Sequence, residues 1–192
     1  MHPQVAAMQG FMQTYSVNQH VQGGRFWLFS FAALCFLAAS FYALLPTRSL
    51  TGTADKIVVV KSEHKMTLLR NDTVLRSYTV SLGRGGTGPK LRDGDHETPE
   101  GDYVIDWRNP KSRFHLSLHI SYPNAMDIRR ARERGFTPGG DIMIHGLQNG
   151  LGWIGRFQRF ADWTDGCIAV TDSEMDQIWR AVPDGTPIEI RP

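Results

Sequence analysis

Apolar and polar positions alternate over short stretches from about residue 55 onward, and this pattern predicts a domain built mainly of strands. Valine, isoleucine, threonine and aromatic residues fill these stretches, while Gly, Pro, Asn and Asp separate them, as is typical of strands joined by turns. We expect strands at residues 56–61, 66–70, 73–81, 102–106, 114–121, 141–145, 167–170 and 186–190. A segment dense in Gly, Pro and Asp, residues 83–101, is predicted to form a long loop.

The strand expected at 114–121 has the clearest alternation. Its apolar residues alternate with His115, Ser117 and His119, so one face should enter the core while the other carries both histidines. The pattern leaves two alternatives open for these histidines, because they can line a binding cleft or simply face water.

Capping signals predict two short helices. Asn124 can cap a helix over about 125–134, and Thr171 with Glu174 has the capping-box spacing for a second helix that ends near Ala181. Four arginines gather on the first helix, and we interpret them as a solvated face rather than an anion-binding surface. Strands with two helices indicate a β-rich α+β domain.

An uncharged apolar run fills residues 26–45, which is about the length of a helix that spans a bilayer. It exceeds the apolar core of a usual signal peptide and no Ala-x-Ala site follows it, so we interpret it as an uncleaved transmembrane anchor. The chain then divides into a tail at 1–25, the anchor at 26–45, a linker at 46–54 and a catalytic domain at 55–192.

Composition and motifs argue against several classes of function. The net charge of +2 is too small to favour nucleic acid as a partner. Cysteines and histidines do not occur at zinc-finger spacing, and the chain has no phosphate-binding Gly-x-x-x-x-Gly-Lys motif. We therefore expect no nucleic acid partner, no metal and no other cofactor.

Cys167 is the candidate nucleophile. The only other cysteine, Cys35, lies inside the apolar run, so Cys167 has no obvious disulfide partner. Gly166 beside it leaves backbone N–H groups accessible to a developing oxyanion. The alternative is a small buried residue at the start of a strand.

His145 is the candidate base. A free thiol with a pKa of about 8.5 is mostly protonated at neutral pH and needs a neighbouring group that accepts its proton. Imidazole titrates near working pH and fits that role. Considered alone, a histidine on an apolar strand is more often a hydrogen-bonded core residue.

Three stretches together resemble one family. They are Gly88–Gly101, Pro138–Gly146 and Thr164–Cys167, and the similarity extends over about 57–192. In combination they are similar to the L,D-transpeptidase catalytic domain family, the cysteine enzymes that remodel bacterial peptidoglycan. The resemblance implies an L,D-transpeptidase-like β-sandwich in which Cys167 and His145 are catalytic.

The resemblance also implies a reaction. The thiolate would attack the third residue of a tetrapeptide stem, release D-alanine and leave a thioester, which a second stem's amine, a wall-attached protein lysine or water would resolve. We assign substrate contacts to Gly146, Thr164, Asp165, His115 and Arg156. Because peptidoglycan lies outside the cytoplasmic membrane, the catalytic domain should be periplasmic and held at the inner membrane by residues 26–45.

One departure from the family pattern is instructive. The family commonly has an arginine two places after the cysteine, where this chain has Ala169. Arg156 and Arg159, in the 21 residues between His145 and Cys167, are candidates to replace it. The Gly-Cys-x-Ala pattern also resembles a divergent branch with peptidoglycan hydrolases, so a hydrolase or amidase that cleaves stem-peptide or wall-protein links is the alternative.

Two further classes of function are alternatives to a cysteine enzyme. A zinc hydrolase would need ligands such as His115, His119, His145 and Cys167, but strand positions four apart are separated by about 13 Å, too far to bind one ion comfortably. A catalytically silent wall-binding module with the same fold is the other class, and it differs from an enzyme in having no activity that depends on Cys167.

Overall fold

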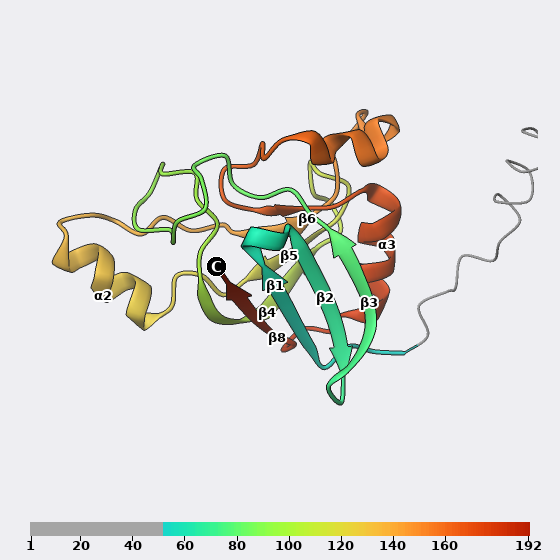
Figure 1. Ribbon diagram of the computed structural model, residues 1–192, viewed down its shortest axis with the longest axis horizontal. Helices are drawn as coiled ribbons and strands as arrows, with labels where there is room; N and C mark the ends of the chain where they lie inside the picture. Colours follow the sequence, from blue (N-terminus) through green and yellow to red (C-terminus); the bar gives the residue numbers. More distant parts are fainter. Residues whose placement is uncertain (1–51) are drawn as a thin grey trace, which may run out of the picture. The chain divides into compact units, whose positions relative to one another are not determined.

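Eight strands hydrogen-bond in the order β3-β2-β1-β8-β4-β5-β6-β7 (Figure 1). The computed structural model describes residues 52–192, and this sheet is the centre of that part of the chain. The strands are β1 (Lys56–Val60), β2 (Lys65–Arg70), β3 (Thr73–Thr79), β4 (Gly101–Asn109), β5 (Ser117–Ile120), β6 (Met143–His145), β7 (Ile168–Ala169) and β8 (Pro187–Arg191). Each lies where the alternation predicted a strand, so the β-rich class is confirmed.

The β-sandwich that the resemblance implies takes the form of one curled sheet. The first part of β4, Gly101 to Val104, pairs with β8, and its remainder pairs with β5. Its register shifts between Ile105 and Trp107, and such an irregularity bends a strand. The two halves of the sheet therefore share β4.

Two α-helices and two 3-10 helices accompany the strands within residues 52–192. They are α2 (Ala125–Glu133), α3 (Asp172–Ala181), η1 (Lys61–Glu63) and η2 (Gly152–Phe160). Asn124 caps α2, and Thr171 forms a reciprocal capping box with Glu174 at α3, so both predicted α-helices are confirmed. The segment of η2, for which the sequence predicted neither a strand nor a helix, forms helical turns interrupted at Gly155, whose φ is 51°.

The core lies between the sheet and α3. In β1 the alternation is regular, with Ile57 and Val59 buried between half-exposed neighbours. Three residues of α3, namely Met175, Ile178 and Ala181, are buried on the face that turns inward. The spacing of three between these positions is that of one helical face, so the apolar side of α3 seals the core.

The strand expected at 114–121 forms only from Ser117 onward. His115 has a φ of 64°, a left-handed conformation that breaks the strand, and its N–H donates to the Asn149 side chain at 2.9 Å. Phe114 therefore does not continue the core face of β5. Its ring instead packs against His145, with 4.7 Å between ring centroids.

The predicted tail and anchor, and most of the predicted linker, lie outside the described residues. Among residues 52–192, no helix is long and apolar enough to cross a membrane.

Candidate active site

Two adjacent strands bring the candidate base and nucleophile together. β6 and β7 pair in parallel, with Ile144 opposite Ile168 and His145 opposite Ala169. His145 is thus the last residue of β6, and Cys167 immediately precedes β7. Both residues line the same cavity of about 480 Å³.

His145 is held in a defined orientation. Its Nδ1 lies 2.6 Å from the carbonyl oxygen of Gly146, so Nδ1–H donates to that oxygen and Nε2 remains as the acceptor. The rings of Phe114 and Trp163 pack against the imidazole, and the residue is only 4% exposed. Burial lowers the pKa of His145, although the bond to Gly146 opposes the shift, and the resting imidazole is therefore neutral near pH 7.

Cys167 carries a free thiol, and its Sγ lies 3.6 Å from the Asp141 carbonyl oxygen. Burial raises the pKa of this thiol, and the carboxylates of Asp165 and Asp141 raise it further, while the Met143 backbone opposes them. The balance of these effects favours the protonated thiol over a preformed thiolate. With the pKa of the thiol raised and that of the imidazole lowered, the two residues form a neutral pair at rest.

Thr164 organises the turn before the nucleophile. Its hydroxyl donates to the Cys167 carbonyl at 2.7 Å and accepts from the Gly166 N–H at 3.2 Å. The Gly166 N–H, which the sequence pattern placed beside the developing oxyanion, is therefore engaged by Thr164 instead. Within residues 52–192 no hydrogen bond occupies the Cys167 N–H, which makes it the better candidate donor.

The loop 83–101 supports this turn from behind. Gly166 has a φ of 119°, and a Cβ there would lie 2.7 Å from the Glu97 carbonyl oxygen. A Cβ on Gly83 would lie 2.2 Å from the His96 carbonyl oxygen. Only glycine allows such close approach of two backbones, so the packing fixes the position of Cys167 through its neighbours.

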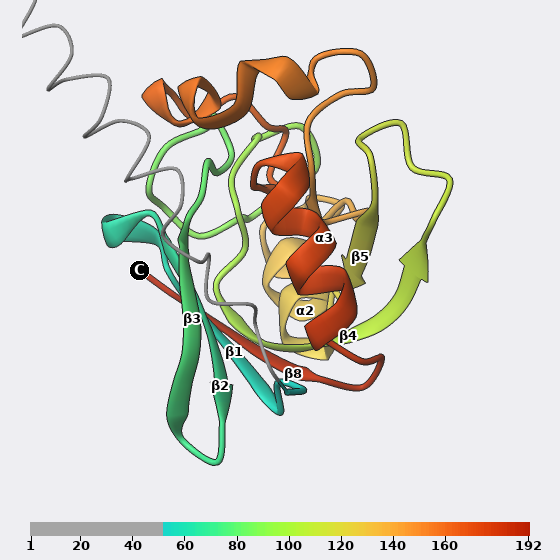
Figure 2. The same cartoon turned by 90° about the vertical axis from the view of Figure 1, so that its right-hand side faces the viewer.

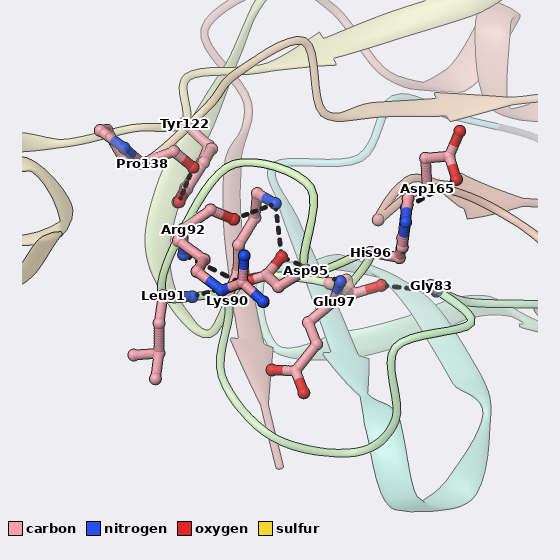
Figure 3. A network of polar contacts seen from close by, with 12 residues as sticks. Gly83, Lys90, Leu91, Arg92, Asp95, His96, Glu97, Tyr122, Pro138 and Asp165 are labelled. Carbon is pink, nitrogen blue, oxygen red and sulfur yellow. Dashed lines mark hydrogen bonds and ion pairs between the residues drawn. The ribbon is translucent and has the colours of Figure 1, made fainter. Parts of the chain in front are cut away.

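Asp95 folds the supporting loop around its carboxylate (Figure 3). It accepts hydrogen bonds from the Lys90 ammonium and from the backbone N–H groups of Leu91, Arg92 and Glu97. Burial alone would raise the pKa of Asp95, but these hydrogen bonds outweigh it and leave the pKa lowered. The ionised carboxylate therefore holds the loop in one conformation.

Asp165, beside the nucleophile, is joined to the same loop. Its carboxylate pairs with His96 at 2.9 Å, as Figure 3 shows, and with Arg84 at 2.8 Å. Asp165 therefore contacts this loop through its carboxylate and also lines the cavity that contains Cys167 and His145.

Lys61 anchors the far side of the loop. It is 1% exposed, and its ammonium donates to the carbonyl oxygens of Gly88 and Thr98 and to the Glu100 carboxylate. Thr98 in turn accepts from the Gly83 N–H through its hydroxyl at 2.9 Å. A buried cation thus links η1 to the segment behind the nucleophile.

The cavity also contains groups that sequence reasoning missed. Lys111 and Arg113 bring two exposed cationic side chains from the β4–β5 hairpin, and Phe114 and Trp163 form apolar walls. Ser117 lies opposite His145 in the β5–β6 register, and its buried hydroxyl has no hydrogen-bond partner within residues 52–192. Buried polar groups normally have a hydrogen-bond partner. The Ser117 hydroxyl is therefore a candidate to form a hydrogen bond with a bound substrate.

The predicted substrate contacts divide into two groups. Thr164 and Asp165 line the cavity, whereas Gly146, His115 and Arg156 are not among its lining residues. Gly146 orients His145 from behind, and Arg156 is exposed on η2.

Both histidines of the 114–121 segment have partners elsewhere. His115 pairs with Asp176 of α3 at 2.8 Å. His119 bonds to Asp106 at 2.6 Å and stacks on Trp107. In the part of the chain that the structure describes, no three His, Cys, Asp or Glu side chains are grouped to hold a metal.

Gln158 of η2 covers the position where the family commonly has arginine. The Ala169 carbonyl oxygen lies 3.5 Å from the Gln158 amide, whose Oε1 accepts from the Trp163 indole at 2.9 Å. Arg159 instead pairs with Glu174 at 2.6 Å. A short side chain at Ala169 is thus accompanied by a buried glutamine that holds Trp163 against His145.

Comparison with known proteins gives a family. A sequence profile of the YkuD family, the L,D-transpeptidase catalytic domain, matches residues 54–190. YafK of Escherichia coli strain K12, an L,D-transpeptidase by provisional assignment, is 32% identical over 142 residues, which are 70% of this chain and 50% of YafK. The chain therefore spans about half the length of the curated relatives it matches.

Solved structures agree with this fold. The helical cell shape determining protein Pgp2 of Campylobacter jejuni matches with a TM-score of 0.53 and 21% identity, over 75% of this chain and 51% of that one. Its K307A mutant matches with a TM-score of 0.54 and 22% identity, over 73% and 48%. At these identities the likeness establishes the fold alone.

Proposed function

Because this chain belongs to the L,D-transpeptidase catalytic domain family, we propose that it is a cysteine-dependent L,D-transpeptidase acting on the tetrapeptide stems of peptidoglycan. The family acts in peptidoglycan metabolism. The observation that carries the proposal is the presence of the free thiol of Cys167 and the oriented imidazole of His145 in one cavity.

The first half-reaction acylates the enzyme. His145 Nε2 accepts the thiol proton as Cys167 Sγ attacks the carbonyl carbon of the third stem residue, and the Cys167 N–H stabilises the oxyanion. The imidazolium then gives its proton to the amine of the departing D-alanine, which leaves a thioester on Cys167.

The second half-reaction transfers the acyl group. His145, neutral again, removes a proton from an incoming amine, which attacks the thioester and restores the thiol. The amine belongs to a second stem or to a lysine of a wall-attached protein. Lys111 and Arg113 attract the free carboxylates of the stems, and the Ser117 hydroxyl offers a hydrogen bond inside the cavity.

The location of the reaction follows from its substrate. We propose that residues 26–45 hold the protein at the inner membrane, with the tail cytoplasmic and the catalytic domain periplasmic. The support is the uncharged apolar run in the sequence. Protease treatment of intact and permeabilised cells would test this, and cleavage within residues 52–192 before permeabilisation of the inner membrane is the expected result.

Product analysis tests the proposed activity. Mass spectrometry of tetrapeptide-bearing muropeptides after incubation with the protein is expected to show dimers crosslinked between third residues, or exchange of the terminal D-alanine for another D-amino acid. If D-alanine is lost, or a wall-attached protein is released, and no new crosslink forms, the protein is a hydrolase and not a transpeptidase. The Gly-Cys-x-Ala pattern motivates that comparison.

The pH dependence should reflect a neutral catalytic pair. Burial lowers the pKa of His145, so the base is lost to protonation only below its ordinary value of about 6.5. Acylation should therefore be independent of pH near 7 and decline with a midpoint below pH 6.5. Because burial raises the pKa of Cys167, its alkylation by iodoacetamide should accelerate mainly above pH 9. An alkylation plateau that begins well below pH 7 would indicate a preformed thiolate–imidazolium pair and contradict this mechanism.

A further inference from the structure

Three exposed aromatic side chains lie along η2. Trp153, Phe157 and Phe160 are 80%, 70% and 84% exposed, and the rings of the two phenylalanines lie 5.9 Å apart, tilted by 35°. Large exposed apolar groups gathered in one place usually mark a binding surface. We call these three residues the aromatic platform.

The platform stands on a fixed support. The Gln158 carbonyl accepts from the Ser81 hydroxyl at 2.9 Å, and Arg159 pairs with Glu174 near the start of α3. In Figures 1 and 2 the orange turns of η2 lie beside that end of α3, at the edge of the fold. Gln158 and Arg159 are therefore anchored, while Phe157 and Phe160 on either side of them are exposed, and binding would require little ordering of the segment.

The platform is continuous with the catalytic cavity. Phe160 precedes Trp163 by three residues, and three residues of chain reach at most about 10 Å. Trp163 lines the catalytic cavity and also a smaller apolar cavity beneath η2, together with Leu151 and Ile154. A ligand that leaves the cavity past Trp163 therefore needs to extend at most about 10 Å further to reach Phe160.

The substrate class of the proposed function carries sugars near the bond that is attacked. Its stem peptides are attached to sugars, and about three stem residues, again roughly 10 Å when extended, separate the sugar from the attacked carbonyl. Pyranose rings have apolar C–H faces that stack on aromatic rings, whose faces carry partial negative charge. Arg156, exposed between the aromatic positions, can donate to hydroxyl or acetamido oxygens.

Building on the proposed function, we propose that the aromatic platform on η2 binds the glycan strand that carries the donor stem. The sugar rings stack on Trp153, Phe157 and Phe160 while the stem runs past Trp163 to Cys167. The platform thereby makes the protein select stems attached to polysaccharide over free peptides.

A binding experiment tests the platform without catalysis. The full chain carrying Cys167→Ala is incubated with stem-free glycan strands, prepared by removing the peptides from peptidoglycan, and its affinity is compared with that of the same chain carrying Phe157→Ser and Phe160→Ser. We expect at least a tenfold loss of affinity in the double variant. Phe136→Ser is the matched control, because Phe136 is 45% exposed but lies outside η2, and it should bind normally.

A kinetic experiment separates this inference from the proposed function. In the active full chain, the double variant should raise KM at least tenfold for stem-bearing glycan strands and leave kcat for free tetrapeptide unchanged. If the wild-type chain processes neither substrate, the proposed function fails, while the binding comparison still decides the inference. Equal glycan affinity of the double variant and its parent would overturn the inference. So would a platform-dependent association with phosphatidylglycerol vesicles that replaces glycan binding, because the platform would then bind lipid.

Discussion

Replacement of Cys167 by alanine is expected to abolish crosslinked and exchanged muropeptide products, with a fall in rate of more than about 10⁴-fold. In the proposed mechanism the sulfur forms the thioester, and within residues 52–192 no other thiol lines the cavity. The methyl group of alanine cannot form this intermediate. Intact-protein mass spectrometry of wild type with donor substrate should also reveal an acyl adduct that the variant lacks.

Two comparisons make this prediction specific. Cys35→Ala changes the only other cysteine of the chain and should leave the products unchanged. Treatment of the wild-type protein with EDTA should also have no effect if the thiol alone is the nucleophile. Activity that survived in Cys167→Ala but disappeared with EDTA would instead favour a metal-dependent hydrolase.

The strands, and the motifs that carry the candidate base and nucleophile, could be predicted because their signals are local. The alternation of Ile57 and Val59 with polar or half-exposed positions encodes a strand directly, and the capping box at Thr171 marks the start of α3. The pairing of β6 with β7 then carries two short motifs, separated by 21 residues, to one cavity. Residues that belong to a short sequence motif can therefore be identified from the sequence alone.

Other parts of the site depend on tertiary contacts that the sequence pattern does not carry. Phe114 fits the alternation of a core strand, but the left-handed backbone at His115 redirects it to the imidazole of His145. The oxyanion donor was assigned to Gly166, but the Thr164 hydroxyl engages its N–H. The role of Gln158 depends on where η2 lies against Ala169, which no local pattern specifies.

The single curled sheet has a similar explanation. Alternation in β4 predicts a strand, but it does not say which neighbours the strand will have. The register shift after Ile105 lets β4 pair with β8 in its first part and with β5 in its second part. Sheet topology is therefore the level that the sequence pattern did not specify, although it located the individual strands.

Lys61→Met is expected to destabilise residues 52–192 by about 3 kcal/mol, the scale observed when one partner of a buried ion pair is removed. Methionine preserves most of the aliphatic stem but cannot donate to the Gly88 and Thr98 carbonyls or pair with Glu100. These acceptors would lose their shared donor. The loss should lower the midpoint of urea unfolding, followed by tryptophan fluorescence, with little change in the slope.

Lys56→Met supplies the matched control, because the Lys56 ammonium pairs with Glu189 at 2.8 Å while its side chain is 40% exposed. Exposed ion pairs contribute at most about 1 kcal/mol, so this variant should unfold near the wild-type midpoint. Lys61→Met should in addition reduce crosslinking by the folded protein, since Lys61 secures the loop that packs behind Gly166. If the two variants lowered the unfolding midpoint equally, burial would not set the strength of these ion pairs. A destabilised Lys61→Met protein with full activity below its unfolding transition would show that the loop positions Cys167 without help from the buried cation.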